Sequence, residues 1–378
     1  MIKNVLITGG AGFIGSNLAR NLINKGYNVT VLDNLSPQIH GVDFKNSPLY
    51  LSIKDIVNFI HGDVLKQADW KKALHGQDVV VHLAAETGTG QSMYEINKYS
   101  NVNIQGTALL LDILANEKHS IKKVIVASSR AVYGEGKSHC KEHASVYPLP
   151  RREQDMSRGD FAVKCPYCGR DVEVQPTDED SKLHPTSVYG ITKQTQEQMV
   201  MTVGKSLGVP TVAFRYQNVY GPGQSLSNPY TGILSIFSTR IKNGNEINIF
   251  EDGKESRDFV YIDDVVEATV LGIEQQAANF EVFNVGYGVP IDVLSVAETL
   301  KSKYGSNTNI KITGNYRLGD IRTNYADLRK IQRLLGFKPK YDFVTGITKF
   351  TGWVDNQDIK DDQYEKSIQE MKAKGLYK

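Results

Sequence analysis

Short apolar runs alternate with amphipathic segments along the first part of the chain. The first run, Val5–Thr8, precedes a glycine-rich turn, and apolar residues then recur at helical spacing from Phe13 to Ile23. Continuous apolar runs of this length are typical of parallel strands buried on both faces. Further strands are predicted at 28–33, 58–61, 79–85, 123–129 and 211–215, and long helices at 97–117 and 188–207. This alternation predicts an α/β fold with a doubly wound parallel sheet.

The alternation becomes less regular after residue 217. Helices are predicted at 232–243, 263–276, 294–303 and 328–335, and short strands at 247–250, 282–285 and 310–312. We interpret residues 218–356 mainly as a smaller C-terminal substrate lobe, which closes over the strand ends of a Rossmann-type domain formed by residues 1–217. Residues 357–378 are rich in Lys, Asp and Gln, which predicts a surface helix or a loose tail.

The turn after the first strand carries a glycine pattern. Gly10, Gly12 and Gly15 fit G-x-G-x-x-G, and Gly9 with the last two fits the wider G-x-x-G-x-x-G spacing. Glycine lets the backbone turn tightly and approach a pyrophosphate at a helix N-terminus. The second strand ends at Asp33, roughly twenty residues on, where a carboxylate binds ribose hydroxyls and repels a 2′-phosphate. The pattern therefore predicts NAD rather than NADP; the alternative is a glycine-rich turn without a dinucleotide.

Composition narrows the class of protein. The 378 residues, 40% of them hydrophobic, suffice for one large α/β domain with a lobe, or for two domains. Lys and Arg number 44 against 42 Asp and Glu, a net charge of +2, and no basic tract indicates nucleic-acid binding. No apolar run approaches membrane-spanning length, and residues 1–8 predict a strand rather than a signal peptide. Three cysteines make no disulfide framework, so we expect a cytoplasmic protein without nucleic-acid or membrane partners.

Three residues combine into a candidate catalytic set. Ser129, after Ser128, ends the fifth predicted strand, where doubly wound sheets bind ligands. Tyr189 and Lys193 share one face at a helix start, a spacing that in isolation is more often an ordinary surface pair. A tyrosine, with a pKa of about 10, is a poor base at neutral pH, but an adjacent ammonium and a cationic nicotinamide favour its phenolate. With a serine hydroxyl on the same oxygen, the set can deprotonate an alcohol while hydride leaves for NAD.

Five segments resemble those of the extended short-chain dehydrogenase/reductases, and more closely the nucleotide-sugar epimerases and dehydratases among them. The segments are Thr8–Gly15, Asn103–Thr107, Ser128–Gly134, Tyr189–Lys193 and Asn218–Pro222. By motif position, Ser129 matches the catalytic Ser or Thr of the family. Dehydratases of the family carry an Asp-Glu pair directly after it, where this chain has Arg130 and Ala131. The resemblance therefore implies epimerisation or simple oxidoreduction rather than loss of water.

Two loops and an insertion sharpen the resemblance toward bacterial dTDP-L-rhamnose 4-epimerases. The loops are Glu86–Glu95 and Leu226–Gly232. Such enzymes are implied to oxidise C4 of a nucleotide-linked sugar, turn the 4-keto sugar over and return the hydride to its other face. The resemblance also implies a homodimer built on the helices at 104–117 and 189–207. A net 4-dehydrogenase or reductase and a non-catalytic NAD-sensing module remain as alternatives.

The resemblance assigns ligand contacts residue by residue. Asn218, Arg257 and Arg322 match positions that hold the nucleotide diphosphate, and arginine suits phosphate through bidentate contacts. For each arginine a surface salt bridge is the alternative. The remaining predicted substrate contacts are Gln91, Ser92, Ser129, Arg130 and Tyr230. The predicted NAD-binding residues are Gly9, Gly12, Phe13, Ile14, Asp33, Asn34, Asp63, Val64, Leu83, Ala84, Ala85, Asn103, Tyr189 and Lys193. For Asp63, contact with the adenine amino group and capping of a helix near 68–74 are equally plausible on sequence.

An insertion over about 136–183 separates Ser129 from Tyr189, which lie much closer in most relatives of the family. It contains two ligand-like pairs, Cys140-x-x-His143 and Cys165-x-x-Cys168. Four such ligands form the closed tetrahedron of a structural Zn²⁺ site, with no open position for catalysis. The insertion has few apolar residues, so a metal could supply its folding energy. Three free thiols in a surface loop are the alternative, and His139 or His184 could replace His143 as fourth ligand.

Overall fold

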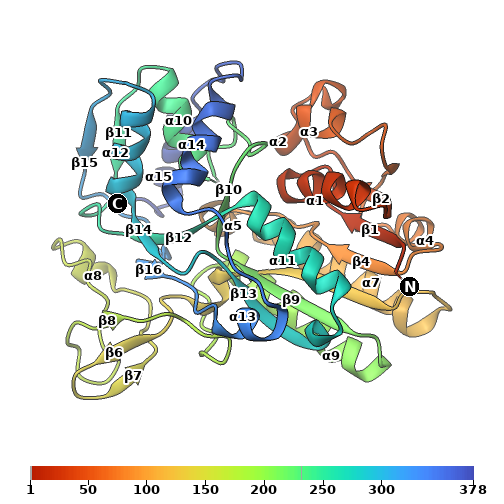
Figure 1. Ribbon diagram of the computed structural model, residues 1–378. Coiled ribbons are helices and arrows are strands. Elements are labelled where there is room, and N and C mark those ends of the chain that lie inside the picture. The colour runs from red at the N-terminus through yellow and green to blue at the C-terminus, as the bar shows by residue number, and fades with distance from the viewer. Residues whose placement is uncertain (1, 231) are drawn as a thin grey trace.

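A seven-stranded parallel sheet forms the centre of the computed structural model, which describes residues 2–230 and 232–378 (Figure 1). Thr231, in the segment 226–232 used above, lies outside the described residues. The order is β13-β9-β5-β4-β1-β2-β3, with every neighbouring pair parallel. The strands are β1 (Asn4–Thr8), β2 (Asn28–Asp33), β3 (Asn58–His61), β4 (Val79–His82), β5 (Lys123–Ser129), β9 (Thr211–Tyr216) and β13 (Glu281–Val285). The predicted doubly wound α/β fold is confirmed, and its strand order reverses between β1 and β4, where such folds bind ligands.

Helices cover both faces of this sheet. The longer ones are α1 (Phe13–Asn24), α4 (Gln67–Leu74), α7 (Gly106–Asn116), α9 (Val188–Leu207) and α11 (Ile262–Glu274). Shorter turns of helix are α2 (Pro37–His40), η1 (Phe44–Asn46), α3 (Pro48–Leu51), α5 (Thr89–Ser92), α6 (Ile96–Tyr99), η2 (Ser100–Gln105), η3 (Arg130–Tyr133) and η4 (Gln276–Ala278). The predicted helix at 188–207 is confirmed. The one at 97–117 consists of α6, the π-helical η2 and α7 in succession.

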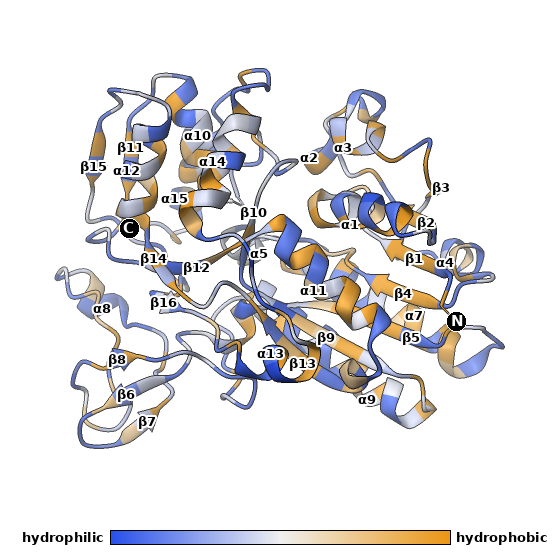
Figure 2. Ribbon diagram, in the orientation of Figure 1, coloured by the Kyte–Doolittle hydropathy of each residue, from blue (hydrophilic) through white to orange (hydrophobic). Residues whose placement is uncertain are grey.

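The sheet residues alternate between two hydrophobic layers. Val5 and Ile7 belong to the cluster that includes residues of α1 and α11, whereas Leu6 belongs to the cluster with residues of α4, α7 and α9. All three side chains are fully buried. Figure 2 shows the central strands in the hydrophobic colour, as expected for strands covered on both faces. This burial fixes the strand ends that carry the candidate site.

The C-terminal part builds two small sheets and a helical layer beside the strand ends. Its strands are β10 (Asn218–Tyr220), β11 (Ile247–Ile249), β12 (Ser256–Tyr261), β14 (Pro290–Asp292), β15 (Ile310–Ile312) and β16 (Thr323–Asn324). Its helices are α10 (Ile233–Lys242), α12 (Val293–Lys303), α13 (Arg329–Leu335), α14 (Phe343–Val354) and α15 (Tyr364–Ala373). In Figure 1, α10, α12, α14 and α15 gather on one side of the molecule, away from the N-terminus.

Two expectations for this part are corrected. The strand expected in the lobe at 282–285 is β13, which pairs with β9 in the main sheet, because its Phe283 and Val285 join the large core. Of the two alternatives for the end of the chain, the helix is confirmed and the loose tail is wrong, because α15 buries Tyr364, Ile368 and Met371. The helix α14 was not predicted, although Phe343, Ile347, Phe350 and Val354 recur at helical spacing.

The insertion forms an arm beside the C-terminal part (Figure 1, lower left). It holds α8 (Glu153–Met156) and a small antiparallel sheet of β6 (Ser138–Cys140), β7 (Ala144–Val146) and β8 (Glu173–Val174), in the order β7-β6-β8. Across residues 2–230 and 232–378, none of the helices has both the length and the apolar character needed to span a bilayer.

Candidate active site

The glycine turn between β1 and α1 presses against the end of β4. Gly9 has φ +66°, and a Cβ there would lie 2.8 Å from the backbone nitrogen of Ala84. A Cβ on Gly15 would lie 2.4 Å from the carbonyl oxygen of Gly9. The first turn of α1 follows Gly12 and has no side-chain cap, so its N–H groups are available to an anion. The backbone therefore fits a pyrophosphate here, and only glycine permits this packing.

Asp33 lies next to this turn at the end of β2. Its Oδ2 accepts the Ala11 N–H at 2.9 Å and its Oδ1 accepts the Leu35 N–H at 2.8 Å. Burial raises the pKa of Asp33, and these hydrogen bonds and the nearby His40 oppose that rise. Asn34 beside it is exposed. The carboxylate is thus anchored at the edge of the turn, in the place required for a ribose.

Two other predicted cofactor residues, Asp63 and Asn103, make hydrogen bonds within the protein. The Asp63 Oδ1 accepts the Leu65 N–H at 2.9 Å, and α4 begins after Lys66 without a side-chain cap, so the capping alternative for Asp63 is wrong. Asn103 is fully buried: its amide accepts from the Glu86 N–H at 2.8 Å and donates to Thr192 Oγ1 at 2.9 Å and to the Glu86 carbonyl. Asn103 therefore positions the loop after β4, and its contact with a cofactor stays a prediction.

The remaining predicted cofactor residues line the same strand ends. Phe13, Ile14, Leu83, Ala84 and Ala85 are partly exposed around the turn. Val64, by contrast, is buried and packs under the start of α7, where a Cβ on Gly106 would lie 2.9 Å from it. Contact of these residues with NAD stays a prediction.

Ser129 and Tyr189 meet at the end of β5. The tyrosine is the second residue of α9, and its phenol lies close enough to the Ser129 side chain for the serine to lower its pKa. The Ser129 Oγ also accepts the Ala131 N–H at 3.2 Å. Burial raises the pKa of Tyr189, while the Ser129 hydrogen bond and the charge of Arg130 lower it. The structure thus places the predicted base beside the predicted hydroxyl.

Lys193 behaves differently from the expectation. It is 3% exposed, and its Nζ donates to Gln196 Oε1 at 2.8 Å. Burial lowers its pKa to about 7, although Glu197 opposes that shift. The charge of Arg130 lowers the pKa of Tyr189, while the Lys193 amine donates to Gln196, and the predicted role of Lys193 beside the tyrosine stays a prediction. This role of Arg130 was missed on sequence, where the residue was a substrate contact only.

The catalytic helix is held at its first turn by two serines and a glycine. Ser187 Oγ accepts the Gly190 N–H at 3.2 Å as the N-cap of α9. Ser92 Oγ accepts the Tyr189 N–H at 3.0 Å and donates to the Thr89 carbonyl at 2.6 Å. A Cβ on Gly190 would lie 2.7 Å from the Ala131 carbonyl oxygen. Ser92 is fully buried and positions Tyr189, and its predicted sugar contact gains no support from this geometry.

Unpartnered polar atoms mark the substrate side. Among the described residues, the buried Arg130 Nη1 and the buried Asn218 Oδ1 have no hydrogen-bond partner. Burial and the nearby Arg257 lower the pKa of Arg130 to about 9, while Asp320 opposes that shift. Arg257 Nη1 donates to the carbonyls of Ser256 at 2.8 Å and Arg322 at 3.0 Å. Arg130 Nη1 and Asn218 Oδ1 could therefore each make a hydrogen bond to a polar ligand.

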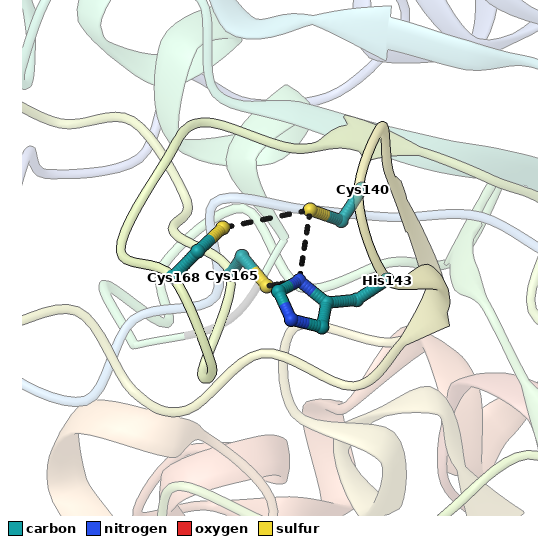
Figure 3. Close-up of side chains that lie close together, drawn as sticks. All are labelled: Cys140, His143, Cys165 and Cys168. Atoms are coloured by element: carbon teal, nitrogen blue, oxygen red, sulfur yellow. Dashed lines mark hydrogen bonds between the residues drawn. The ribbon is translucent and has the colours of Figure 1, made fainter.

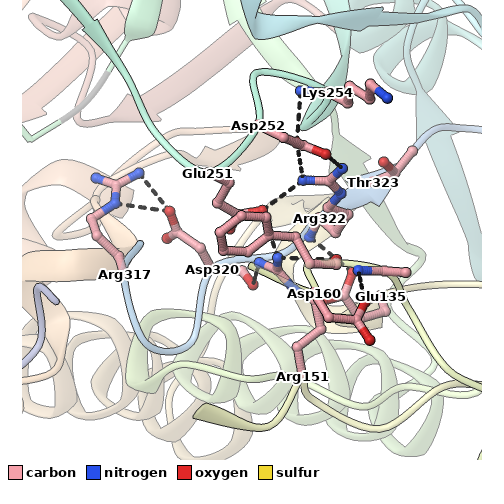
Figure 4. Close-up of polar contacts among 12 residues, drawn as sticks. Glu135, Arg151, Asp160, Glu251, Asp252, Lys254, Arg317, Asp320, Arg322 and Thr323 are labelled. Carbon is pink, nitrogen blue, oxygen red and sulfur yellow. Dashed lines mark hydrogen bonds and ion pairs between the residues drawn. The ribbon is translucent and has the colours of Figure 1, made fainter. Parts of the chain in front are cut away.

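Arg322, in contrast, is already paired. Its Nη1 lies 2.7 Å from Glu251 Oε2 and 2.6 Å from Asp252 Oδ1, and its Nη2 donates to Asp252 Oδ2 at 2.8 Å (Figure 4). The salt-bridge alternative therefore describes Arg322 in this state, although its side chain is only 12% exposed. Glu251 and Asp252 lie in a turn that is far from Arg322 in the sequence, so no sequence pattern predicted this pairing.

Gln91 and Tyr230 are engaged within the protein. The Gln91 amide exchanges hydrogen bonds with Gln38 at 3.0 and 3.3 Å. The Tyr230 hydroxyl donates to Glu370 of α15, which also accepts from Tyr94 at 3.3 Å. No hydrogen bond between either residue and Ser129, Tyr189 or Lys193 occurs in the described part of the chain. Their predicted sugar contacts gain no support from these geometries.

The two pairs of the insertion come together in space. One ligand atom from each of Cys140, His143, Cys165 and Cys168 lies within 4.8 Å of the others (Figure 3). Cys140 Sγ is 3.6 Å from His143 Nδ1 and 3.7 Å from Cys168 Sγ, and Cys165 Sγ is 3.7 Å from His143 Nδ1. Tetrahedral Zn²⁺, with bonds of about 2.3 Å to sulfur and about 2.0 Å to nitrogen, implies separations of about 3.5–3.8 Å. The four side chains therefore fit such an ion, and His143 rather than His139 or His184 completes the group.

Comparison with known proteins agrees with this geometry. The model of the NAD dependent epimerase/dehydratase family matches residues 5–154 and 164–286. The dTDP-L-rhamnose 4-epimerase of Burkholderia thailandensis is 35% identical over 93% of this chain and 95% of its own. A putative UDP-glucose 4-epimerase of Methanocaldococcus jannaschii is 29% identical over 93% of this chain and 98% of its own.

Solved structures give the same picture. A Thermotoga maritima UDP-glucose 4-epimerase with UDP-glucose superposes with a TM-score of 0.75 at 30% identity, over 93% of this chain and 98% of that one. A Bacillus cereus UDP-glucuronic acid 4-epimerase in complex with UDP-glucuronic acid and NAD gives 0.76 at 26% identity, over 93% and 99%. The chain belongs to the NAD dependent epimerase/dehydratase family, within the extended short-chain dehydrogenase/reductases.

Proposed function

We propose that the protein is an NAD-dependent nucleotide-sugar 4-epimerase that acts on dTDP-L-rhamnose and its C4 epimer, dTDP-6-deoxy-L-talose. The observation that carries the proposal is the placement of Tyr189, at the start of α9, beside Ser129 at the end of β5, in a fold that also has the tight glycine turn between β1 and α1. A tyrosine base needs such a place, because the substrate carbon must reach a nicotinamide while its hydroxyl reaches the phenol.

The residues of the chain divide the work as follows. NAD, when bound by the glycine turn and Asp33, supplies a hydride acceptor that can also return the hydride. Tyr189, as phenolate, takes the proton of the C4 hydroxyl and later gives it back, while Ser129 holds the same oxygen. Arg130 favours the phenolate by its charge. Lys193 is our candidate for holding the cofactor beside this pair.

Two other reactions are less consistent with the site. Loss of water needs an acid and a base after Ser129, and Arg130 and Ala131 supply neither. A net dehydrogenase would also use Ser129, Tyr189 and Lys193, and it would differ from an epimerase only in releasing the reduced cofactor. A non-catalytic NAD-sensing module would need neither the Ser129–Tyr189 contact nor the serine that holds Tyr189 in place.

The nucleotide is proposed on the similarity to the Burkholderia enzyme at 35% identity, whereas the UDP-sugar relatives are at 30% or below. Asn218, Arg257 and Arg322 are the groups that we assign to the diphosphate, with Arg130 as a further substrate contact. The test is product analysis by NMR with a panel of dTDP-, UDP-, GDP- and CDP-sugars. We expect inversion at C4 and the highest kcat/KM with dTDP-deoxyhexoses; preferred turnover of a UDP-sugar would contradict the nucleotide, and no inversion with any would contradict the function.

We also propose a structural Zn²⁺ in the insertion, held by Cys140, His143, Cys165 and Cys168. The separations of 3.6 and 3.7 Å between ligand atoms support it, because free thiols have no reason to converge on an imidazole at these spacings. Apart from the metal ligands, the small core of the arm has Val146 and Val172, so the ion would supply folding energy.

Elemental analysis tests the metal. Purified wild-type protein is expected to contain about one zinc per chain, and Cys165→Ser to lose it. Ser145→Ala on the neighbouring β7 is the control and should keep its zinc. Stoichiometric zinc missing from the wild type after refolding with the metal would contradict the site.

The helices α7 and α9 pack against each other and are our candidate homodimer surface. Ile191 on α9 is 50% exposed, and Leu207 at its end is 38% exposed. A four-helix contact with a second copy would cover such side chains. Sedimentation as a monomer at micromolar concentration would contradict it.

A further inference from the structure

Arg151 extends from the insertion into the substrate side of the site. Its side chain is 4% exposed and contacts four acceptors, one of which is the Phe161 carbonyl at 3.5 Å from Nη1. Its Nε lies 3.3 Å from Glu135 Oε1, its Nη1 2.6 Å from Glu251 Oε2, and its Nη2 donates to the Asp320 carbonyl at 3.1 Å (Figure 4). Glu135 follows η3 closely in the sequence, so this arginine links the catalytic strand end to the C-terminal part.

The carboxylate of Glu251 is shared between two arginines. Its Oε2 lies 2.6 Å from Arg151 Nη1 and 2.7 Å from Arg322 Nη1. Its side chain is fully buried, so water cannot replace a lost cation. The other partner of Arg322, Asp252, is 38% exposed and can be solvated when the arginine leaves. Among the ion pairs of Arg322, the one with the buried Glu251 is therefore the costlier to break. Glu251 has a second cationic partner, Arg151.

The insertion contacts the segment that carries Arg322 on both sides of this arginine. Before Arg322, Tyr316 forms a small core with Met156 and Phe161 of the insertion. After it, the Thr177 N–H donates to the Tyr325 carbonyl at 2.9 Å, and the Asp327 N–H donates to the Thr177 carbonyl at 3.0 Å. These contacts hold Arg151 in place relative to Arg322.

We propose that Arg151 is a positioning residue that sets the affinity for the nucleotide diphosphate, because it keeps Glu251 paired when Arg322 turns from Glu251 to the phosphates. The inference rests on the proposed function, in which a nucleotide diphosphate binds beside Arg257 and Arg322. Without Arg151, release of Arg322 would leave a buried carboxylate without a cation, which opposes release. The arm thereby acquires a role in substrate binding beyond its own fold.

The test measures binding of dTDP and of UDP to the NAD-loaded, full-length protein by calorimetry. Arg151→Met is expected to weaken binding at least about fivefold, because neighbouring charges in one network couple strongly. The double variant Arg151→Met/Glu251→Gln is expected to return toward wild-type affinity, since Arg322 is then no longer held by Glu251. Arg152→Met is the matched control: its side chain is 73% exposed and pairs with Asp155.

The outcomes separate this role from a merely structural one. Equal weakening in the single and the double variant, or wild-type affinity in Arg151→Met, would overturn the inference. If Arg151→Met alone does not fold, Glu251→Gln is compared with the double variant: equal affinities support the inference and a further loss overturns it. A wild-type protein that binds neither dTDP nor UDP would refute the proposed function itself, and the inference with it.

Discussion

The two sides of the candidate site are held together by different means. On the cofactor side, the turn between β1 and α1 is fixed by backbone packing, with Gly9 against Ala84 and Gly15 against Gly9. On the substrate side, Glu135 and Glu251 form buried ion pairs with Arg151 of the insertion, and Glu251 also pairs with Arg322. The cofactor side therefore depends on glycine residues, which have no side chain, and the substrate side depends on paired charges.

Amino-acid substitutions are expected to affect the two sides of the site differently. Backbone packing tolerates no added atom but needs few residues, all close together in the sequence. A buried charge network needs partners from several distant segments, and losing one partner leaves the others uncompensated. We expect substitutions to affect cofactor retention on the first side and substrate affinity on the second.

The largest effect is expected where the two sides meet. Tyr189→Phe removes the proton acceptor while leaving the ring packing and the helix start unchanged. Turnover should fall at least about a thousandfold, in line with the loss of a general base in an active site. Bound NAD, measured after release from the purified protein, should stay at the wild-type level. Wild-type turnover in this variant would remove Tyr189 as the base.

Gly9→Ala tests the cofactor side. A Cβ there meets the backbone of β4 at 2.8 Å and sits at φ +66°, so we expect loss of bound NAD and destabilisation of about 2–4 kcal/mol. Gly26→Ala is a matched control, because Gly26 also has positive φ, +85°, but nothing within 4 Å. It should cost only the backbone strain and keep NAD. Equal NAD loss in both variants would show that strain rather than close approach matters.

Arg130→Met tests the charge beside the base. Removing the guanidinium removes an effect that lowers the pKa of Tyr189, so that pKa should rise. The ascending limb of the kcat–pH profile should move to higher pH, and turnover at neutral pH should fall about tenfold. Arg130→Lys keeps the charge, so the pKa of Tyr189 and the pH profile should stay close to those of the wild type. An unchanged pH profile in Arg130→Met would assign the residue to substrate contact alone.

The smallest effect concerns stability. In the protein without NAD, burial lowers the pKa of Lys193 from 10.5 to about 7. Between these values the unfolded chain binds the proton and the folded chain does not, so the free energy of unfolding rises with pH through that window. Lys193→Met should lack this contribution, whose slope is at most about 1.4 kcal/mol per pH unit. Identical pH dependence in the two proteins from pH 7 to 10 would contradict the burial of this amine.

The cofactor side was predictable because its determinants are local. Gly9, Gly12 and Gly15 lie within one turn, and the strand that follows ends at Asp33. The helix that presents Tyr189 was predicted to its ends, since Ser187 caps it and Gly208 terminates it in the left-handed conformation. In each case, a few neighbouring residues carry the whole physical reason.

The substrate side was predictable only in part. Arg257 and Arg322 were assigned by resemblance, but the pairing of Arg322 with Glu251 joins residues that no sequence pattern connects. Ser92 was taken for a sugar contact because it lies in a ligand loop, yet its hydroxyl holds the Tyr189 N–H. Hydrogen bonds between distant segments depend on the packed fold, and a single sequence does not reveal them.

The convergence of the insertion's four ligands is an intermediate case. The spacing of Cys140 with His143 and of Cys165 with Cys168 predicted two pairs. The antiparallel pairing of β6 with β7 and β8 brings them to one point. Local spacing thus indicated the chemistry, while the choice of His143 over His139 and His184 required the fold.

The proposed epimerisation requires that a hydride leaves C4 of the sugar and returns to the same sugar. The most direct measurement incubates the NAD-loaded protein with dTDP-L-rhamnose and records both the sugar configuration by NMR and the near-ultraviolet absorbance of reduced nicotinamide. We predict inversion at C4 with no accumulation of reduced cofactor in the steady state. A 4-keto sugar formed together with an equal amount of released reduced cofactor would contradict epimerisation and identify a net dehydrogenase.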